Sequence, residues 1–326
     1  MKILKEVEFK KNSKTKIIAI VGPTATGKSE LALKLAQKIN GEIISADSMQ
    51  IYKKMNIATA KLSETEQCGI KHHLIDCVDL NDRFSVFDYI KLAKMALNEI
   101  VNKNKKPILV GGTGLYIDSF LNEINFDVEN CNSEIRTKLL DELKTFGSNY
   151  LFEKLKKIDF EYAKKIHPNN HRRLVRALEI YYSTGKTLIK NEQNSKPKFQ
   201  KLNYIKIGLN FLNRQTLYSK IDSRVDFMMR KGLLAEAELI LNLCENCLNS
   251  TAKQAIGYKE FVPYFSGVSS LDDCVAKLKQ NTRNLAKRQL TWFKKDEKSN
   301  WFFLDDKSDI FKDILNLVQT FFNSNS

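Results

Sequence analysis

The sequence contains no apolar run that approaches the roughly 18 residues of a membrane-spanning helix. Residues 1 to 16 are basic and polar, and they lack the apolar central region of a secretory signal peptide. Both absences favour a cytoplasmic location.

The cysteines lack the spacing of a complete metal site. Cys244 and Cys247 form the single Cys-x-x-Cys pair, and no second pair or nearby histidine completes a zinc site. The pair follows a helical pattern at residues 239 to 243, so structural thiols are favoured over a metal or redox centre. His167 and His171 flank a helix-start signal and are not predicted to bind metal.

Acidic residues are too few to balance the basic ones. The formal net charge is +15 and the isoelectric point is about 9.3. Such a charge favours a polyanionic partner, although a lysine-rich surface that only aids solubility remains the alternative. With 43% hydrophobic residues, the 326-residue chain can form a real core in one large domain or two modest ones.

One motif organises the first part of the chain. The apolar run at residues 16 to 21 leads into Gly22-Pro23-Thr24-Ala25-Thr26-Gly27-Lys28-Ser29, and a helical pattern follows. This order of strand, glycine loop and helix matches a P-loop, in which backbone N–H groups and the lysine hold phosphate oxygens and the serine can hold Mg²⁺. The helix start adds its positive dipole at the same place. The motif therefore predicts polyphosphate binding.

The first 125 residues alternate strand and helix signals. Short apolar runs at residues 42 to 47, 73 to 76 and 107 to 114 are separated by helical patterns, which predicts a parallel sheet covered on both faces. Ligands bind beyond the carboxyl ends of such strands. The P-loop, Asp47 with Ser48, and Gly112 with Thr113 are expected to converge there.

From the residues alone, Asp47 could be either a helix N-cap or a carboxylate of the site. Asp after a strand is commonly a helix N-cap, and Asp76 or Asp79 could equally supply the metal-side acid of a nucleotide hydrolase. The segment Asp47-Ser48-Met49-Gln50-Ile51-Tyr52 is, however, dense in groups that hydrogen-bond to and stack on a base.

Helical patterns replace the alternation from residue 126 to 200, which predicts a helical insertion. Its helices are expected at residues 134 to 145, 150 to 158 and 170 to 184, with Gly185 as the stop and a polar loop at 190 to 201. Arg172, Arg173 and Arg176 gather on the last helix, where they favour phosphate contacts over a merely solvated basic face.

The rest of the chain is predicted to return to the sheet through a strand at 204 to 211 and to add a short strand at 301 to 304. On the first helix between them, Ile221, Val225, Met228 and Met229 mark a buried side. A later helix, residues 275 to 294, is expected to be amphipathic, and its basic side suits a nucleic-acid backbone better than a membrane surface. Its apolar side is Val275, Leu278, Leu285 and Trp292, and its basic side is Lys279, Arg283, Lys287 and Lys294.

An ordered set of segments resembles the bacterial tRNA dimethylallyltransferase family. Beyond the P-loop and residues 47 to 52, the set comprises Gly111-Gly112-Thr113-Gly114-Leu115-Tyr116, Arg173-Leu174-Val175-Arg176-Ala177-Leu178-Glu179, Ala255-Ile256-Gly257-Tyr258-Lys259-Glu260 and Ala286-Lys287-Arg288-Gln289-Leu290-Thr291-Trp292-Phe293. The segments span residues 17 to 293 in the family's order. Asn170 and Phe160 depart from the pattern, where the family usually has Asp and often has Pro.

The resemblance implies a P-loop-containing parallel α/β sheet flanked by helices, with a helical insertion domain. It divides the chain into a basic extension at 1–16, a core at 17–125 and 201–326, and an insertion at 126–200 that contacts tRNA. It implies transfer of a dimethylallyl group from dimethylallyl diphosphate to the N6 amine of adenosine 37, next to the anticodon of tRNA. No membrane and no obligate protein partner are indicated.

The resemblance also assigns the site. The implied catalytic residues are Asp47, as the group that accepts the amine proton, with Thr113 and Arg224 on the leaving diphosphate. The diphosphate would lie on residues Gly22 to Ser29, that is Gly22, Pro23, Thr24, Ala25, Thr26, Gly27, Lys28 and Ser29, with Mg²⁺ on Ser29. The implied tRNA-binding residues are Asp47, Ser48, Met49, Gln50, Arg136, Arg172, Arg173, Arg176, Gly257, Tyr258, Arg283, Lys287 and Arg288.

Three alternatives stay open. P-loops mostly serve nucleotides, so an ATP-dependent kinase or RNA-stimulated NTPase is one, although no Asn-Lys-x-Asp guanine signature is present. A basic RNA-binding module is another, but Gly27-Lys28-Ser29 is intact. The third keeps the prenyl chemistry and uses a free adenine nucleotide as the acceptor; the basic helical insertion favours tRNA.

Overall fold

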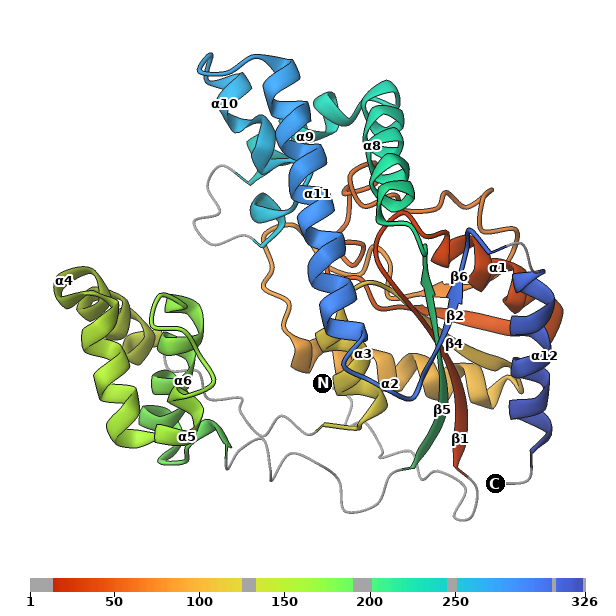
Figure 1. Ribbon diagram of the computed structural model, residues 1–326, viewed down its shortest axis with the longest axis horizontal. Coiled ribbons are helices and arrows are strands. Elements are labelled where there is room, and N and C mark those ends of the chain that lie inside the picture. Colours follow the sequence, from red (N-terminus) through yellow and green to blue (C-terminus); the bar gives the residue numbers. More distant parts are fainter. Residues whose placement is uncertain (1–13, 125–132, 190–200, 245–250, 307–308, 325–326) are drawn as a thin grey trace. The chain divides into compact units, whose positions relative to one another are not determined.

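The protein forms two compact units in the computed structural model (Figure 1). Residues 1–121 and 201–326 make the larger unit, and residues 122–200 make the smaller one. The structure describes residues 14–124, 133–189, 201–244, 251–306 and 309–324. Most of the predicted extension at residues 1–16 lies outside this part of the chain. Its last two residues belong to the first strand, which starts at Thr15.

A six-stranded parallel sheet forms the centre of the larger unit. Its strands in spatial order are β3 (His72–His73), β2 (Gly41–Ser45), β4 (Lys106–Val110), β1 (Thr15–Val21), β5 (Leu202–Asn210) and β6 (Ser299–Phe303). Residues 17 to 21 of β1 are fully buried, because both faces of a parallel sheet are covered by helices.

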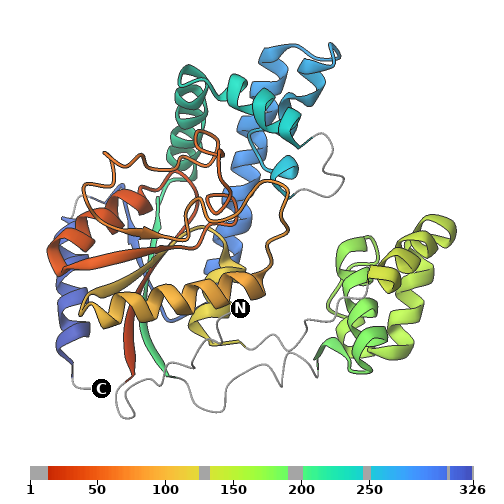
Figure 2. The same ribbon diagram turned by 180° about the vertical axis from the view of Figure 1, so that it is seen from behind.

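The direction of each crossover decides which face a helix covers. The helices α1 (Lys28–Ile39) and α12 (Ile310–Asn323) share one hydrophobic core with alternate residues of the strands, among them Ile18, Ile20 and Ile108. The helices α2 (Val86–Asn102) and α3 (Gly114–Leu121) follow strands whose crossovers run in the opposite direction, so right-handed connection places them on the other face (Figure 2).

Further helices extend from the carboxyl edge of the sheet (Figure 1). They are α8 (Arg214–Arg230), α9 (Leu233–Leu243), the short turns η1 (Ala252–Gln254), η2 (Lys259–Phe261) and α10 (Val262–Phe265), and the long helix α11 (Leu271–Phe293). Helices α8 and α11 pack against each other. The P-loop and the connection after β4 open at the same edge, which is where ligands of such sheets bind.

The smaller unit is all helical. It consists of α4 (Ser133–Ile158), α5 (Phe160–Ala163) and α6 (His171–Thr184). Gly147 interrupts α4 with a φ of 80°, so the element is two helices, as the sequence predicts. Asn170 caps α6 by accepting a hydrogen bond from the Arg173 amide, and Gly185 ends it with a φ of 68°. Asn170 thus caps the helix where the family usually has Asp.

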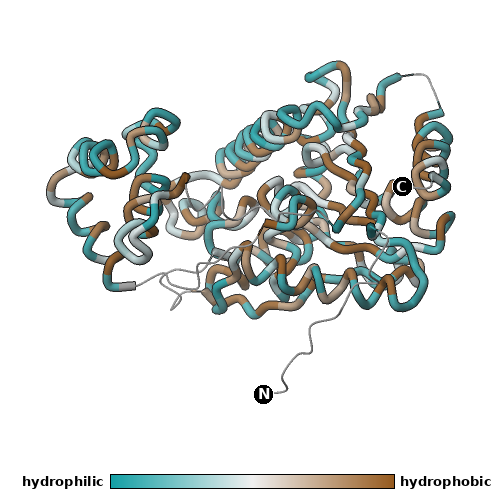
Figure 3. Tube along the Cα trace, turned by 90° about the horizontal axis from the view of Figure 1, so that it is seen from below, coloured by the Kyte–Doolittle hydropathy of each residue, from teal (hydrophilic) through white to brown (hydrophobic). Residues whose placement is uncertain are grey.

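Most predicted elements are present, with shifted ends. The strand expected at 73 to 76 is only His72–His73, and the last strand begins two residues before its predicted start, at Ser299. Figure 3 shows hydrophobic and hydrophilic residues alternating along the helices, as amphipathic helices require. The polar loop predicted at 190 to 201 lies outside the described residues, apart from Lys201. No helix among the described residues is long and apolar enough to cross a membrane.

Candidate active site

The P-loop has the backbone that its glycines predict. Gly22 has a φ of 141°, and a Cβ there would overlap the backbone carbonyl of Leu209 in β5. Gly27, at a φ of 71°, is the N-cap of α1, and Ala25 also has a positive φ of 67°. The loop therefore wraps closely around the first turn of α1, where backbone N–H groups and the helix dipole favour an anion.

Lys28 lies at the centre of this loop. Its Nζ donates to the Pro23 carbonyl at 2.6 Å, and the Thr26 hydroxyl donates to the same oxygen at 2.9 Å. Burial and, to a lesser degree, the charge of Arg224 lower the Lys28 pKa from 10.5 to about 7, while the Asp47 carboxylate acts in the opposite direction. Lys28 is thus poised to gain a proton when an anion binds.

Arg224 places a second cation at the P-loop. It lies on α8, far from Lys28 in the sequence, and burial lowers its pKa while Asp47 raises it. Among the described residues, no side chain forms a hydrogen bond or ion pair with Arg224, so direct contact does not neutralise its charge. Arg224, joined by Lys28 whenever Lys28 is protonated, carries more positive charge than the single Asp47 carboxylate offsets, which is the electrostatic arrangement of an anion site.

Asp47 is a cap, as one interpretation of its sequence context predicts, and its functional role stays a prediction. Its Oδ1 accepts hydrogen bonds from the backbone amides of Met49, at 2.8 Å, and Gln50, at 3.2 Å, so it caps the turn after β2. The same carboxylate lies within electrostatic range of Lys28 and Arg224. The cap holds the carboxylate in a fixed orientation next to the P-loop cations.

Thr113 joins the ends of β2 and β4. The Ser48 amide donates to its hydroxyl at 3.0 Å, and that hydroxyl lies 3.3 Å from the Ser48 Oγ. The Thr113 amide donates to the Ala46 carbonyl at 3.1 Å. The structure therefore brings together the P-loop, Asp47, Ser48, Thr113 and Arg224, as expected from the carboxyl ends of neighbouring strands.

The segment after Asp47 differs from the prediction of a base-stacking cluster. Ile51 and Tyr52 are each 1% exposed and belong to the core, so the Tyr52 ring offers no free face to a base. The Gln50 amide accepts from the Ser45 hydroxyl at 3.1 Å and donates to the Thr59 carbonyl at 3.1 Å. Gln50 thereby organises its own loop, and Ser48 and Met49 are the half-buried side chains of this segment next to Asp47.

The two other acids considered for a metal are already paired. Asp76 lies 2.6 Å from the Lys61 Nζ, and Asp79 lies 2.9 Å from the Lys53 Nζ. Each pair neutralises its carboxylate with a lysine of the loop after β2, so the structure favours a surface role for both acids.

The basic side of α11 is partly used for packing. Arg283 pairs with Asp222 of α8, and Lys279 pairs with Asp226 at 2.6 Å. Acids of α8 therefore lie opposite two of the four residues on the predicted basic side, and the tRNA contact of Arg283 stays a prediction. Lys287 and Arg288 are exposed and remain available to a polyanion. The buried side of α11 is Cys274, Leu278, Ala286 and Phe293, whereas Trp292 is 38% exposed.

Tyr258 was also predicted to bind tRNA, and the structure places its side chain in the core. It is 0% exposed, and its hydroxyl donates to Glu236 at 2.9 Å. Glu236 also accepts from the backbone amides of residues 56 to 58. Gly257 has a φ of 107°, and a Cβ there would lie 2.7 Å from the Ala58 Cβ. These residues shape the loop after β2 and offer RNA little side-chain surface.

The smaller unit presents its arginines in two groups. Arg136 and Arg176 each donate to the buried Glu179 carboxylate at 3.1 Å. Arg172 and Arg173, at the start of α6, are exposed. Two arginines around one carboxylate leave a net positive charge, and the exposed pair adds to it, so this surface suits a polyanion.

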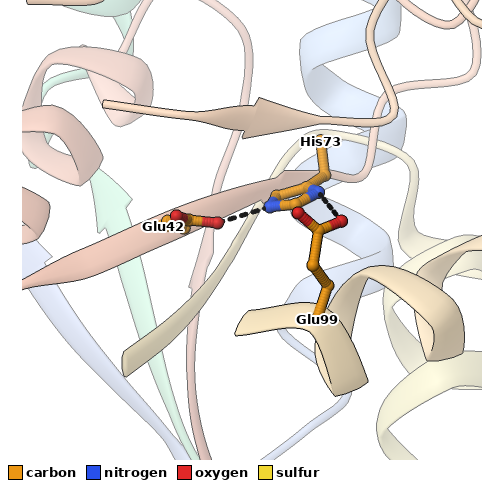
Figure 4. Close-up of side chains that lie close together, drawn as sticks. All are labelled: Glu42, His73 and Glu99. Carbon is orange, nitrogen blue, oxygen red and sulfur yellow. Dashed lines mark hydrogen bonds and ion pairs between the residues drawn. The ribbon is translucent and has the colours of Figure 1, made fainter. Parts of the chain in front are cut away.

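One group of metal-type ligands lies elsewhere in the described part of the chain (Figure 4). His73 Nε2 lies 2.7 Å from Glu42, and His73 Nδ1 lies 3.8 Å from Glu99. Lysines already neutralise both carboxylates, with Lys105 at 2.8 Å from Glu42 and Lys71 at 2.6 Å from Glu99. Glu42 sits near the amino end of β2, away from the P-loop edge, so this cluster is an ion-pair network of the fold.

Gln289 is the site residue that sequence reasoning missed. Its Oε1 accepts from the Thr24 amide of the P-loop at 2.9 Å, and its Nε2 donates to the Gly112 carbonyl at 3.0 Å. Gln289 stands inside a segment quoted for the family resemblance, between charged and apolar neighbours. The signal that could have identified Gln289 is its position as a polar residue among apolar neighbours of an amphipathic helix.

The parallel sheet and the glycine loop between β1 and α1 define a P-loop protein of the α/β class. A family model described as IPP transferase matches residues 50–296. The tRNA dimethylallyltransferase of Caldanaerobacter subterraneus is 49% identical over 89% of this chain and 92% of its own length. That of Bacillus subtilis is 45% identical over 89% of this chain and 91% of its own. The chain therefore belongs to the IPP transferase family.

Solved structures agree with this assignment. The crystal structure of a tRNA isopentenylpyrophosphate transferase from Bacillus halodurans has a TM-score of 0.70 at 39% identity and covers 94% of this chain and 97% of that chain. A eukaryotic dimethylallyltransferase acting on tRNA has a TM-score of 0.77 at 33% identity, with 90% of this chain and 75% of that chain covered. The parallel α/β fold and the family are thus both established.

Proposed function

We propose that this protein transfers a dimethylallyl group from dimethylallyl diphosphate to the N6 amine of adenosine 37 in the anticodon loop of tRNA. The observation that carries the proposal is a pair of basic side chains, Lys28 of the intact P-loop and Arg224 of α8, which interact electrostatically with the Asp47 carboxylate. The names of the curated relatives, all tRNA dimethylallyltransferases, support the same reaction.

The cations and the P-loop amides would bind the diphosphate. As the bond between the allylic C1 and the diphosphate oxygen breaks, negative charge grows on the leaving group. Lys28, Arg224 and the amides of residues 25 to 29 would lie near that charge and would lower the barrier electrostatically. Thr113 would add a hydroxyl donor, once the hydroxyl turns from Ser48 to the phosphate.

Asp47 would act on the other substrate. The N6 amine of adenine forms a bond to C1 while the C1–O bond breaks, and the nitrogen must then lose one proton. A carboxylate within hydrogen-bond reach orients the amine and accepts that proton, which it passes on to solvent. Because two backbone amides hold Asp47 Oδ1, the carboxylate keeps its orientation as the charges around it change.

Mg²⁺ is proposed as the cofactor. The Ser29 hydroxyl, on the first turn of α1, is the oxygen ligand that a P-loop offers to this ion, and hard cations prefer such oxygen donors. When bound, Mg²⁺ supplies further positive charge to the diphosphate. Lys28 and Arg224 alone carry less charge than a fully ionised diphosphate, so the residues present fit an additional cation.

The anticodon stem-loop is proposed to contact the exposed cations. Lys287 and Arg288 on α11, and Arg172 and Arg173 on α6, are exposed, and within the described ranges they have no ion pair with an acidic side chain, unlike Arg283 and Arg136. Phosphate contacts of this kind position RNA without reading its sequence. The target adenine must leave its stack to reach Asp47, as in other enzymes that modify a base. A tRNA substrate also fits the predicted cytoplasmic location.

Incubation with labelled dimethylallyl diphosphate, Mg²⁺ and unmodified tRNA tests the proposal, with ATP and AMP as competing acceptors. We expect label in tRNA and none in AMP, and no ATP turnover. Label in AMP alone would replace tRNA by a free nucleotide as the acceptor. Nucleotide turnover without a prenyl donor would favour a kinase or NTPase.

A further inference from the structure

Helix α11 contacts both phosphate-side loops of the site through one side chain. The Gln289 amide accepts from the Thr24 N–H of the P-loop and donates to the Gly112 carbonyl, which directly precedes Thr113. One planar group thus fixes the distance between the loop proposed to hold the diphosphate and the loop that carries Thr113. Lys287 and Arg288, proposed to contact tRNA, stand immediately before it in the helix.

The glycines after β4 make room for this helix. A Cβ at Gly112 would overlap the Gln289 amide, and a Cβ at Gly114 would overlap the Trp292 ring. Neither glycine has a positive φ, so conformation alone does not require glycine there. The close approach of α11 therefore explains Gly112 and Gly114, whereas Gly111 makes room for the backbone of Ala46 after β2.

A second contact holds the end of α11 in place. Trp292 Nε1 donates to Asp118 of α3 at 2.6 Å. The buried Lys206 of β5 pairs with Asp118 at 3.0 Å and with Asp296 at 2.6 Å. Asp118 thus links α11, α3 and the sheet, and these contacts fix the position of the end of α11 relative to the loops.

We propose that Gln289 is a positioning residue that couples tRNA binding on α11 to diphosphate binding in the P-loop, an inference that rests on the proposed function. In the coupled arrangement, RNA contacts hold α11 against the loops, and the Gln289 hydrogen bonds to Thr24 and Gly112 then keep the P-loop and the turn that carries Thr113 in place for the diphosphate. Coupling is reciprocal, so diphosphate tightens RNA binding by the same factor.

The test measures the affinity for inorganic diphosphate, with Mg²⁺, by titration calorimetry in the absence and presence of saturating unmodified anticodon stem-loop RNA. For the unaltered protein we expect RNA to tighten diphosphate binding by about fivefold or more. For Gln289→Ala we expect less than a twofold effect of RNA, with the affinity for RNA alone unchanged. Gln280→Ala removes the same amide from an exposed position of α11 and is expected to behave like the unaltered protein.

Gln289→Glu separates positioning from folding. The carboxylate keeps an acceptor for the Thr24 amide and loses the donor to Gly112, so we expect a folded protein with reduced coupling. Full coupling in a folded Gln289→Ala protein would overturn the proposal. Independent binding of RNA and diphosphate by the unaltered protein would overturn it too and leave the proposed function standing. Failure of the unaltered protein to bind either ligand would contradict the proposed function itself.

Discussion

Binding of the diphosphate is expected to draw a proton from solvent onto Lys28. In the ligand-free protein, burial and Arg224 lower the Lys28 pKa to about 7, so at pH 8 only about a tenth of this side chain is charged. A bound diphosphate places negative charge beside the amine and raises its pKa again. Binding at pH 8 is therefore expected to take up about 0.9 proton, and each pH unit above 7 weakens binding by about 1.4 kcal/mol.

Calorimetric titration of dimethylallyl diphosphate in two buffers of different ionisation enthalpy measures this uptake. At pH 8 the terminal phosphate is ionised, since its pKa is near 6, and so contributes little. Lys28→Arg is the matched control, because a guanidinium keeps its proton at this pH and should show no uptake. Zero uptake, or proton release, by the unaltered protein would refute the assignment of a neutral Lys28 to the ligand-free site.

Further outcomes follow from the same contacts. Between pH 7 and 10.5, Lys28 is charged in the unfolded chain and mostly neutral in the folded protein, so it loses its proton on folding. The free energy of unfolding should therefore rise with pH across this window, relative to that of Lys28→Met. Urea unfolding at both ends of the window measures this, and the same pH dependence in both proteins would contradict it. Asp47→Asn is expected to bind tRNA normally and to transfer the alkyl group at least about a hundredfold more slowly than the unaltered protein. The control Asp76→Asn alters a surface acid paired with a lysine and should keep the rate of the unaltered protein. An unchanged transfer rate in Asp47→Asn would remove Asp47 from the mechanism. The double variant Lys287→Ala, Arg288→Ala should weaken tRNA binding and lower the slope of the logarithm of the binding constant against the logarithm of salt concentration by about two. The control double variant Lys38→Ala, Lys312→Ala removes the same charge from α1 and α12 and should keep the slope. Equal slopes for the two double variants would show that α11 makes no phosphate contact.

Local signals predicted the parts of the site that are close in sequence. The P-loop motif predicted the turn between β1 and α1. Its glycines Gly22 and Gly27 adopt positive φ angles, and Gly22 also lies too close to the Leu209 backbone for a side chain. Apolar runs gave the strands, and parallel topology then placed Asp47 and Thr113 at the same edge as the P-loop. The cap at Asn170 and the stop at Gly185 follow equally local rules.

Local sequence signals could not predict contacts between segments that are distant in the sequence. That Asp222 and Asp226 of α8 would pair with Arg283 and Lys279 depends on how two helices pack, which periodicity does not encode. The same holds for the burial of Tyr258. Arg224 was assigned through the family resemblance, and its effect on Lys28 appears only when α8 is placed beside the P-loop.

The most direct test of the central claim is the chemical location of the transferred group. Unmodified tRNA is incubated with the protein, Mg²⁺ and dimethylallyl diphosphate, then digested to nucleosides and analysed by mass spectrometry, beside a transcript that carries guanosine at position 37. We expect one adenosine per tRNA with a dimethylallyl group on N6, and none in the guanosine transcript. Modification of the guanosine transcript, or no modified adenosine in either, would contradict it.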